Sequence, residues 1–188
     1  MNLPNKLTLS RVIAIPIFIV FFVLGTLGNG VHYNGINIYR AIAAAIFVAA
    51  SVTDYFDGKI ARERNLITNF GKLMDPLADK MLVITAMMLL TESKEVNYLC
   101  TLIVVLRELT ISSIRLIALE KGIVIAASIW GKLKTSTQMV SLVLILFHFY
   151  KINNLAYYIT YGLFYLSTLF VIISLIDYII KSKEVFLD

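Results

Sequence analysis

Two long stretches without a charged residue restrict what this chain can fold into. No Asp, Glu, Lys or Arg occurs from Val12 to Tyr39, and none occurs from Ile152 through Ile176. Of the 188 residues, 59% are hydrophobic and only 15% are charged, whereas soluble domains average about 45–50% apolar and about 25% charged residues. A soluble domain of this size cannot bury so much apolar surface. The sequence therefore excludes soluble, disordered and fibrous proteins and indicates an integral membrane protein.

Six segments are apolar and long enough for a transmembrane helix, which needs about 20 residues. They run approximately over residues 10–27, 38–61, 69–91, 96–119, 128–150 and 152–176. No linker between them is long enough to separate domains, so we expect a single all-α domain over residues 1–188. The polar start of the chain lacks the pattern of a cleaved signal peptide, so we expect the first span to be retained.

The Lys and Arg residues set the expected orientation, because cytoplasmic loops are enriched in them. An even number of spans puts both termini on one side, and 13 of the 17 Lys and Arg residues fall on that side. The opposite loops hold only Arg40, Lys94 and Lys151. We therefore expect a multi-pass protein of the cell membrane with cytoplasmic termini. Its net charge of +5 then reflects topology and contact with anionic membrane lipids, not nucleic acid. The 13 residues are Lys6, Arg11, Lys59, Arg62, Arg64, Lys72, Lys80, Arg115, Lys121, Lys132, Lys134, Lys181 and Lys183.

Four aspartates interrupt the second and third expected spans near their cytoplasmic ends. At about 100° per residue, Asp54 and Asp57 lie on one helical face, and Asp75 and Asp79 lie on one face of the next helix. Three small residues share these faces. Small residues let a ligand approach the backbone closely, although they also suit close helix packing. They are Gly58, Ala61 and Gly71.

Converging carboxylates in an apolar environment need compensating positive charge. A set of hard oxygen ligands favours Mg²⁺ or Mn²⁺ and argues against zinc. Two such ions would hold a diphosphate and stabilise the attacking and leaving oxygens of a displacement at phosphorus. We therefore expect a polar, cytoplasm-facing cavity that binds two metal ions.

The full pattern from Asp54 to Asp79 reads D-x2-D-G-x2-A-R-x8-G-x3-D-x3-D. It resembles the signature of the CDP-alcohol phosphotransferase family at every defined position. The resemblance implies a homodimeric six-helix membrane enzyme that transfers a group from a CDP-linked donor and releases CMP. It also implies that Asp54, Asp57, Asp75 and Asp79 bind the metal ions and that Asp79 is the general base. The residues that it assigns to the CDP site are Asp54, Gly58, Ala61, Arg62 and Gly71.

The N-terminus resembles the P-N-x-L-T-x-x-R opening of one branch of this family, the bacterial phosphatidylglycerophosphate synthases. Asn5, Thr8 and Arg11 follow one another at three-residue intervals and lie on adjoining parts of one helical face. We expect them to contact the nucleotide. The alternative is a helix cap followed by an arginine anchored at the membrane interface.

The fourth expected span contains Arg107 and Glu108, and ionisable residues inside a span indicate a functional site. Glu108, Ser112 and Arg115 fall within about 60° of one another on a helical wheel. Adjacent residues do not face each other on a helix, so we do not expect Arg107 to pair with Glu108. We expect Glu108 instead to orient another cation while arginines bind a phosphate.

Two lysines of the following segment, Lys132 and Lys134, lie on the same expected side. They either complete a cationic pocket or reflect topology and lipid contact alone. Residues 106–109 and 122–135 again resemble the phosphatidylglycerophosphate synthase branch, which uses CDP-diacylglycerol and glycerol 3-phosphate. A cationic pocket suits that anionic acceptor. The expected acceptor residues are Arg107, Glu108, Ser112, Arg115, Lys132 and Lys134.

Other functions remain open at this point. Serine, inositol phosphate or phosphatidylglycerol would be the acceptor in other branches of the family. A cation-coupled transporter would place its acids near the bilayer midplane, often in repeated halves, and neither feature is visible. A prenyl-diphosphate enzyme spaces its aspartates differently. Asp177 in the last span has no assigned function, and we expect it either to pair with a lysine or to end the helix.

Overall fold

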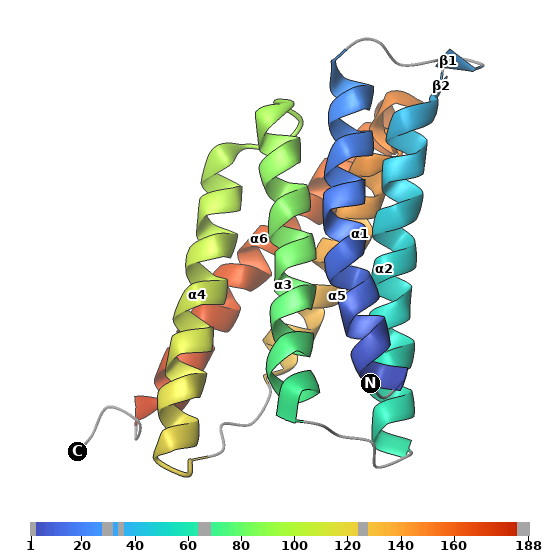
Figure 1. Ribbon diagram of the computed structural model, residues 1–188. Helices are drawn as coiled ribbons and strands as arrows, with labels where there is room; N and C mark the ends of the chain where they lie inside the picture. Colours follow the sequence, from blue (N-terminus) through green and yellow to red (C-terminus); the bar gives the residue numbers. More distant parts are fainter. Residues whose placement is uncertain (1–2, 28–31, 34–35, 64–68, 124–127, 184–188) are drawn as a thin grey trace. The chain divides into compact units, whose positions relative to one another are not determined.

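In the part of the chain that it describes, the computed structural model has six α-helices at the places where six spans are expected (Figure 1). The structure describes residues 3–27, 32–33, 36–63, 69–123 and 128–183. Within them, the side chains of residues 3–8, 32, 33, 36, 54–63, 69–77, 79 and 119 are outside the description. The described helices are α1 (Leu3–Thr26), α2 (Ile38–Glu63), α3 (Asn69–Glu92), α4 (Tyr98–Glu120), α5 (Ile129–Leu146) and α6 (Asn154–Lys181).

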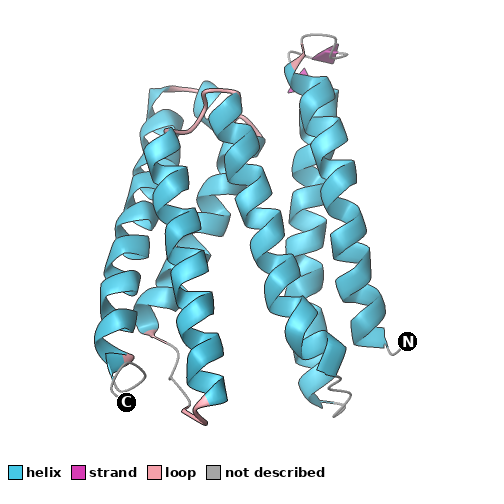
Figure 2. Cartoon of the chain, turned by 60° about the vertical axis from the view of Figure 1, so that its left-hand side comes forward, coloured by secondary structure: helices cyan, strands magenta, loops and turns pink. Residues whose placement is uncertain are grey.

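Three short elements complete the described fold. Strands β1 (His32–Tyr33) and β2 (Ile36–Asn37) form a small antiparallel pair between α1 and α2, drawn in magenta in Figure 2. A 3-10 helix, η1 (Phe149–Lys151), separates α5 from α6. The prediction of an all-helical fold is therefore confirmed, apart from this pair of two-residue strands between α1 and α2.

The chain divides into two compact units, Met1–Ser93 and Lys94–Asp188. In the first unit, α1 packs against both α2 and α3. Three aromatic rings form the centre of the contact between α1 and α2: the Phe18 ring lies 6.0 Å from that of Phe22 and 5.9 Å from that of Phe47. Alanines of α2 allow this close approach, since Ala43 and Ala44 are completely buried. Buried residues of α3, such as Leu82 and Leu90, extend the core.

In the second unit, α6 packs against α5 and α4. Polar side chains define where two of its helices begin. The Ser128 hydroxyl accepts a hydrogen bond from the Trp130 backbone N–H, and the Asn153 side chain accepts one from that of Ala156. Both are N-caps, which satisfy backbone donors that have no partner within the helix. Gly122 follows the end of α4 with a φ of +71°, a conformation that glycine adopts without strain.

Two helices of the described part are long and apolar enough to cross a membrane, at Leu9–Thr26 and Asn154–Lys181. Residues Ile38–Thr53 of α2 form a shorter apolar stretch. Large apolar side chains are exposed along several helices, including Ile13 and Val20 of α1 and Leu102 and Leu109 of α4. Such surfaces are unfavourable in water and favourable against lipid. They indicate a membrane protein, whereas six complete crossings stay a prediction.

An arginine joins α1 to the start of α2. Arg40 is buried, and its guanidinium lies 3.8 Å from the centre of the Phe22 ring. Its Nη1 also donates a hydrogen bond of 3.5 Å to the Thr26 hydroxyl. Gly25 leaves the space for the arginine stem, because an added Cβ would lie 2.7 Å from Arg40 Cγ and 3.0 Å from its backbone nitrogen. The contact therefore depends on glycine at this position.

We expect Gly25→Ala to destabilise the protein by about 1–3 kcal/mol, the usual cost of overpacking. The clash involves the backbone and the start of the Arg40 side chain, which cannot move without separating α1 from α2. The measurement is the thermal midpoint of unfolding in detergent. Gly162→Ala in α6 is the control, because a Cβ there meets nothing within 4 Å in the described part of the chain. Equal thermal midpoints for the two variants would show that the contact with Arg40 does not require glycine at position 25.

Candidate active site

The signature aspartates lie on two consecutive helices of the first unit. Asp54 and Asp57 fall in the C-terminal part of α2, and Asp75 and Asp79 fall in the first half of α3. The expectation that both halves of the motif are helical is confirmed, so the face-sharing argument applies to each of them. The side chains of all eight motif residues are outside the description. Their roles in binding metal and CDP, and that of Asp79 as base, stay predictions.

The N-terminal motif residues are all part of α1. The side chains of Asn5 and Thr8 are outside the description, whereas Arg11 is described and is only 2% exposed. An arginine anchored at a membrane interface keeps its charged end in contact with water. The burial of Arg11 therefore argues against a simple anchor. It places a cation inside the unit that carries the signature aspartates.

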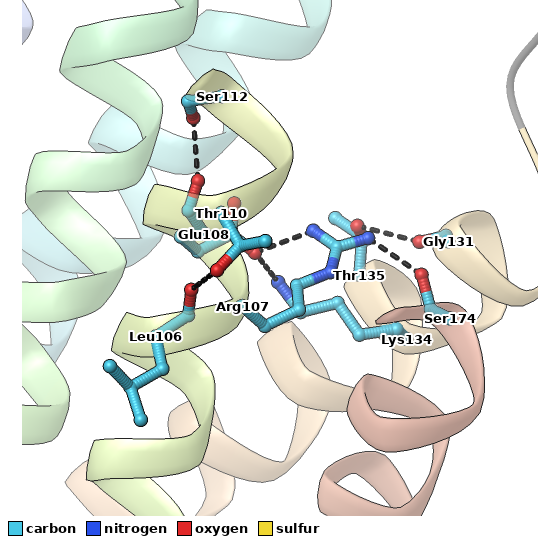
Figure 3. Close-up of polar contacts among 9 residues, drawn as sticks. All are labelled: Leu106, Arg107, Glu108, Thr110, Ser112, Gly131, Lys134, Thr135 and Ser174. Carbon is cyan, nitrogen blue, oxygen red and sulfur yellow. Dashed lines mark hydrogen bonds and ion pairs between the residues drawn. The ribbon is translucent and has the colours of Figure 1, made fainter. Parts of the chain in front are cut away.

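The second unit holds a buried network of charged side chains from α4 and α5 (Figure 3). Glu108 Oε1 accepts a hydrogen bond of 2.7 Å from Lys134 Nζ and another of 2.7 Å from Arg107 Nη1. Glu108 and Lys134 are each 6% exposed. The expected pairing of Glu108 with another cation is therefore confirmed for Lys134, whereas the binding of a phosphate by arginines stays a prediction.

The expectation that Arg107 does not pair with Glu108 is wrong. Their side chains form a direct ion pair of 2.7 Å although the residues are adjacent on α4. The rule that adjacent residues point apart describes where side chains leave a helix. The arginine side chain is long enough to turn back, and burial favours this because a buried guanidinium needs a carboxylate partner. One carboxylate oxygen thus serves two cations.

The other expected acceptor residues are less closely involved. The Ser112 hydroxyl donates a hydrogen bond of 2.6 Å to the Glu108 backbone carbonyl, one turn back on α4. Arg115 and Lys132 are exposed, and neither contributes to the ion pairs described around Glu108. The structure therefore brings together Arg107, Glu108 and Lys134. Acceptor contacts by Ser112, Arg115 and Lys132 stay predictions.

Two residues of this network were not found from the sequence. Ser174 of α6 accepts a hydrogen bond of 2.7 Å from Arg107 Nη2 through its hydroxyl oxygen, and it is 1% exposed. Gly131 lies beside them in α5, where an added Cβ would be 3.6 Å from Arg107 Nη2 and 3.7 Å from Ser174 Oγ. The available signal for Ser174 was weak: it is a small polar residue seven positions after Ser167 in an apolar helix.

Two further acidic residues of the second unit lie close to basic side chains. Asp177 pairs with Lys181 at 2.9 Å, one turn further along α6, which confirms the expected pairing with a lysine. Glu95 precedes α4 and lies 3.7 Å from His148, which follows α5. Among the described side chains, no group of three or more His, Cys, Asp or Glu residues is arranged to hold a metal ion. The aspartates expected to bind metal are not among those side chains.

The sequence was also compared with known proteins. The model of the CDP-alcohol phosphatidyltransferase family matches residues 1–178. A protein of Bacillus subtilis (strain 168) is 34% identical over 97% of this chain and 96% of its own length. One of Shigella flexneri is 36% identical over 100% of this chain and 98% of its own length. One of Rickettsia bellii (strain RML369-C) is 40% identical over 75% of this chain and 72% of its own length.

All three relatives carry the name CDP-diacylglycerol–glycerol-3-phosphate 3-phosphatidyltransferase. The family match extends from the N-terminal motif through both helices of the aspartate signature and includes Arg107, Glu108, Lys134 and Ser174. The resemblance first seen in the spacing of a few residues thus covers nearly the whole sequence. The chain belongs to the CDP-alcohol phosphatidyltransferase family.

Proposed function

We propose that this protein transfers the phosphatidyl group of CDP-diacylglycerol to glycerol 3-phosphate, forming phosphatidylglycerophosphate and CMP. Relatives that match over nearly their full length carry the name of this reaction. The observation that carries the choice of acceptor is the buried network of Arg107, Glu108 and Lys134. It combines two cations with one carboxylate, so its formal charge is +1. Such a site favours an anion, and glycerol 3-phosphate is an anionic alcohol.

Arg107 has a hydrogen-bond donor to spare for that anion. Its two terminal nitrogens are engaged by Glu108 and Ser174, whereas its Nε is buried and has no hydrogen-bond partner among the described residues. Leaving a buried donor unsatisfied costs about 1–3 kcal/mol. A phosphate oxygen would satisfy it with a charge-assisted bond. The arrangement therefore suits a substrate that brings its own acceptors into the site.

The aspartates of α2 and α3 form the proposed donor site. A donor set made of carboxylates alone fits a hard divalent cation, so Asp54, Asp57, Asp75 and Asp79 would hold Mg²⁺ or Mn²⁺, with two ions proposed. When bound, the metal ions would neutralise the negative charge of the diphosphate. Gly58, Ala61 and Gly71 would let the nucleotide approach the helices closely. Arg62 would bind the diphosphate, with Asn5, Thr8 and Arg11 contacting the nucleotide from α1.

In the proposed reaction, the acceptor hydroxyl oxygen attacks the phosphorus atom that carries diacylglycerol. A new P–O bond forms there, the bond from this phosphorus to the bridging oxygen breaks, and CMP leaves with the electron pair. Asp79 takes the proton of the attacking hydroxyl. Direct attack without a covalent enzyme intermediate is proposed, since family resemblance favours it.

The proposed setting is a six-span homodimer in the cell membrane with cytoplasmic termini. The distribution of Lys and Arg supports this orientation. The exposed leucine and isoleucine side chains of several helices support contact with lipid tails. Both substrates would then meet at the cytoplasmic membrane surface, CDP-diacylglycerol from the bilayer and glycerol 3-phosphate from the water phase.

We expect purified protein in detergent micelles to release CMP from CDP-diacylglycerol only when Mg²⁺ or Mn²⁺ and glycerol 3-phosphate are both present. Asp79→Asn should lower kcat by at least about 100-fold, because the general base is lost. Asp177→Asn is the control, since that aspartate pairs with Lys181 outside the signature. CMP release with serine, inositol phosphate or phosphatidylglycerol but not glycerol 3-phosphate would refute the proposed acceptor.

We expect Glu108→Gln to lower the stability of the protein by about 3–5 kcal/mol, the usual cost of removing one partner from a buried ion pair. Two cations would then remain near one another without the carboxylate that they share. The thermal midpoint of unfolding in detergent measures the effect. Glu120→Gln, which alters an exposed glutamate of the same helix, is the control. Adding Lys134→Met to Glu108→Gln should recover part of the loss, and no recovery would argue against the shared pairing.

A further inference from the structure

The hydroxyl of Ser174 is used in an unusual way for a serine within a helix. Buried Ser and Thr side chains in helices commonly bond to a backbone carbonyl of the preceding turn. Ser167 of α6 does so, donating 2.7 Å to the Phe164 carbonyl, and Ser141 of α5 donates 2.9 Å to that of Gln138. The Ser174 oxygen instead accepts 2.7 Å from Arg107 Nη2, across the contact between α6 and α4. Its bond therefore fixes a side chain of another helix.

This bond determines how the guanidinium of Arg107 is turned. The guanidinium is planar, so two bonds at different nitrogens hold its orientation. Glu108 holds Nη1 and Ser174 holds Nη2, at 2.7 Å each. Each terminal nitrogen still has a second N–H, whereas Nε is the nitrogen of this guanidinium that is buried without a partner among the described residues. Glu108 alone would hold one corner of the plane and leave the group free to rotate about that bond.

A glycine of α5 lies close to the bond between Arg107 and Ser174. Gly131 carries no side chain where it passes Arg107 Nη2 and Ser174 Oγ, and even an added Cβ would make only ordinary contacts at 3.6 and 3.7 Å. The Ser174 hydroxyl also keeps its own hydrogen, because its oxygen acts as the acceptor in the bond to Arg107. Arg107 and Ser174 thus keep further hydrogen-bond donors beyond the bond between them.

We propose that Ser174 is a positioning residue for the acceptor, which holds Arg107 so that its Nε–H meets the phosphate of glycerol 3-phosphate. The inference rests on the proposed function, because it names a residue that prepares the same acceptor site. A positioning role of Ser174 differs from a purely structural link between α4 and α6 in one measurable respect. A structural link would affect folding or both substrates, whereas a positioning residue affects the acceptor.

The first experiment measures the steady-state kinetics of the full-length protein in detergent micelles with Mg²⁺. Ser174→Ala should raise KM for glycerol 3-phosphate by about 10- to 150-fold, the equivalent of one hydrogen bond to a charged group. KM for CDP-diacylglycerol and kcat should change by less than about twofold, as expected when uniform binding is lost. Ser174→Thr keeps the hydroxyl and should restore most of the acceptor affinity.

Two further variants control for packing. Ser167→Ala removes a hydroxyl that is buried on the same helix, 1% exposed like Ser174 and bonded to the backbone of its own helix, so KM for the acceptor should stay unchanged. Ser174→Cys keeps the side-chain volume but is a weak hydrogen-bond acceptor. It should reproduce the effect of Ser174→Ala, and it carries the test if the alanine variant does not fold. An equal rise in KM for both substrates would overturn the proposal.

The second experiment is a double-mutant cycle with Arg107. If Ser174 acts through the guanidinium, then Ser174→Ala should have no further effect on the acceptor KM in an Arg107→Ala protein. Independent, additive effects would overturn the proposal. The proposed function is tested separately by the unmodified protein. Its failure to release CMP in response to glycerol 3-phosphate would refute the function, whereas normal activity with an unchanged KM in Ser174→Ala and Ser174→Cys would refute the positioning role alone.

Discussion

The shared carboxylate of Glu108 is the interaction on which the second unit depends. Burying a single charge in an apolar environment is costly, and the cost falls only when an opposite charge lies within bonding distance. Here one oxygen atom accepts from both Arg107 and Lys134 at 2.7 Å. The arrangement draws together side chains of α4 and α5, and Ser174 adds α6 through its bond to Arg107. Three helices thus meet at a polar point, where excess positive charge favours an anionic ligand.

Much of the fold followed from hydrophobic length alone. Six apolar segments predicted six helices, and the boundaries agree within about five residues except at the start of α1. That helix begins at Leu3, whereas the first expected span begins near residue 10. The reason is physical: apolar length measures how much chain suits lipid, whereas a helix extends into polar residues as long as its backbone bonds are satisfied. The same distinction explains α2, whose apolar stretch ends at Thr53 although the helix continues through the signature to Glu63.

The site was predictable where it depends on spacing along one helix and less so where it depends on contacts between helices. The three-residue and four-residue spacings within the two aspartate pairs placed each pair on one helical face, and both segments are helical. Glu108 was recognised because an acid is costly inside an apolar span and therefore indicates a functional site. The pairing of Arg107 with Glu108 was missed because the direction in which a side chain leaves the helix does not fix where the end of a long, flexible arginine lies. Ser174 was missed because its partner is 67 positions away, and no local pattern reports such a contact.

Both units place an arginine beside a glycine of a neighbouring helix, but the two contacts differ in tightness. Arg40 fills the space at Gly25 so closely that a single added carbon would lie 2.7 Å from its stem, and its guanidinium is covered by the Phe22 ring. This arginine therefore serves packing. At Gly131 the same added carbon would lie 3.6 Å from Arg107 Nη2, in ordinary contact. The guanidinium there is held at two corners while its Nε has no partner within the described part of the chain. What distinguishes Arg107 from Arg40 is therefore the looser contact with the glycine and the two fixed corners of its guanidinium, and this is the arrangement that suits a ligand.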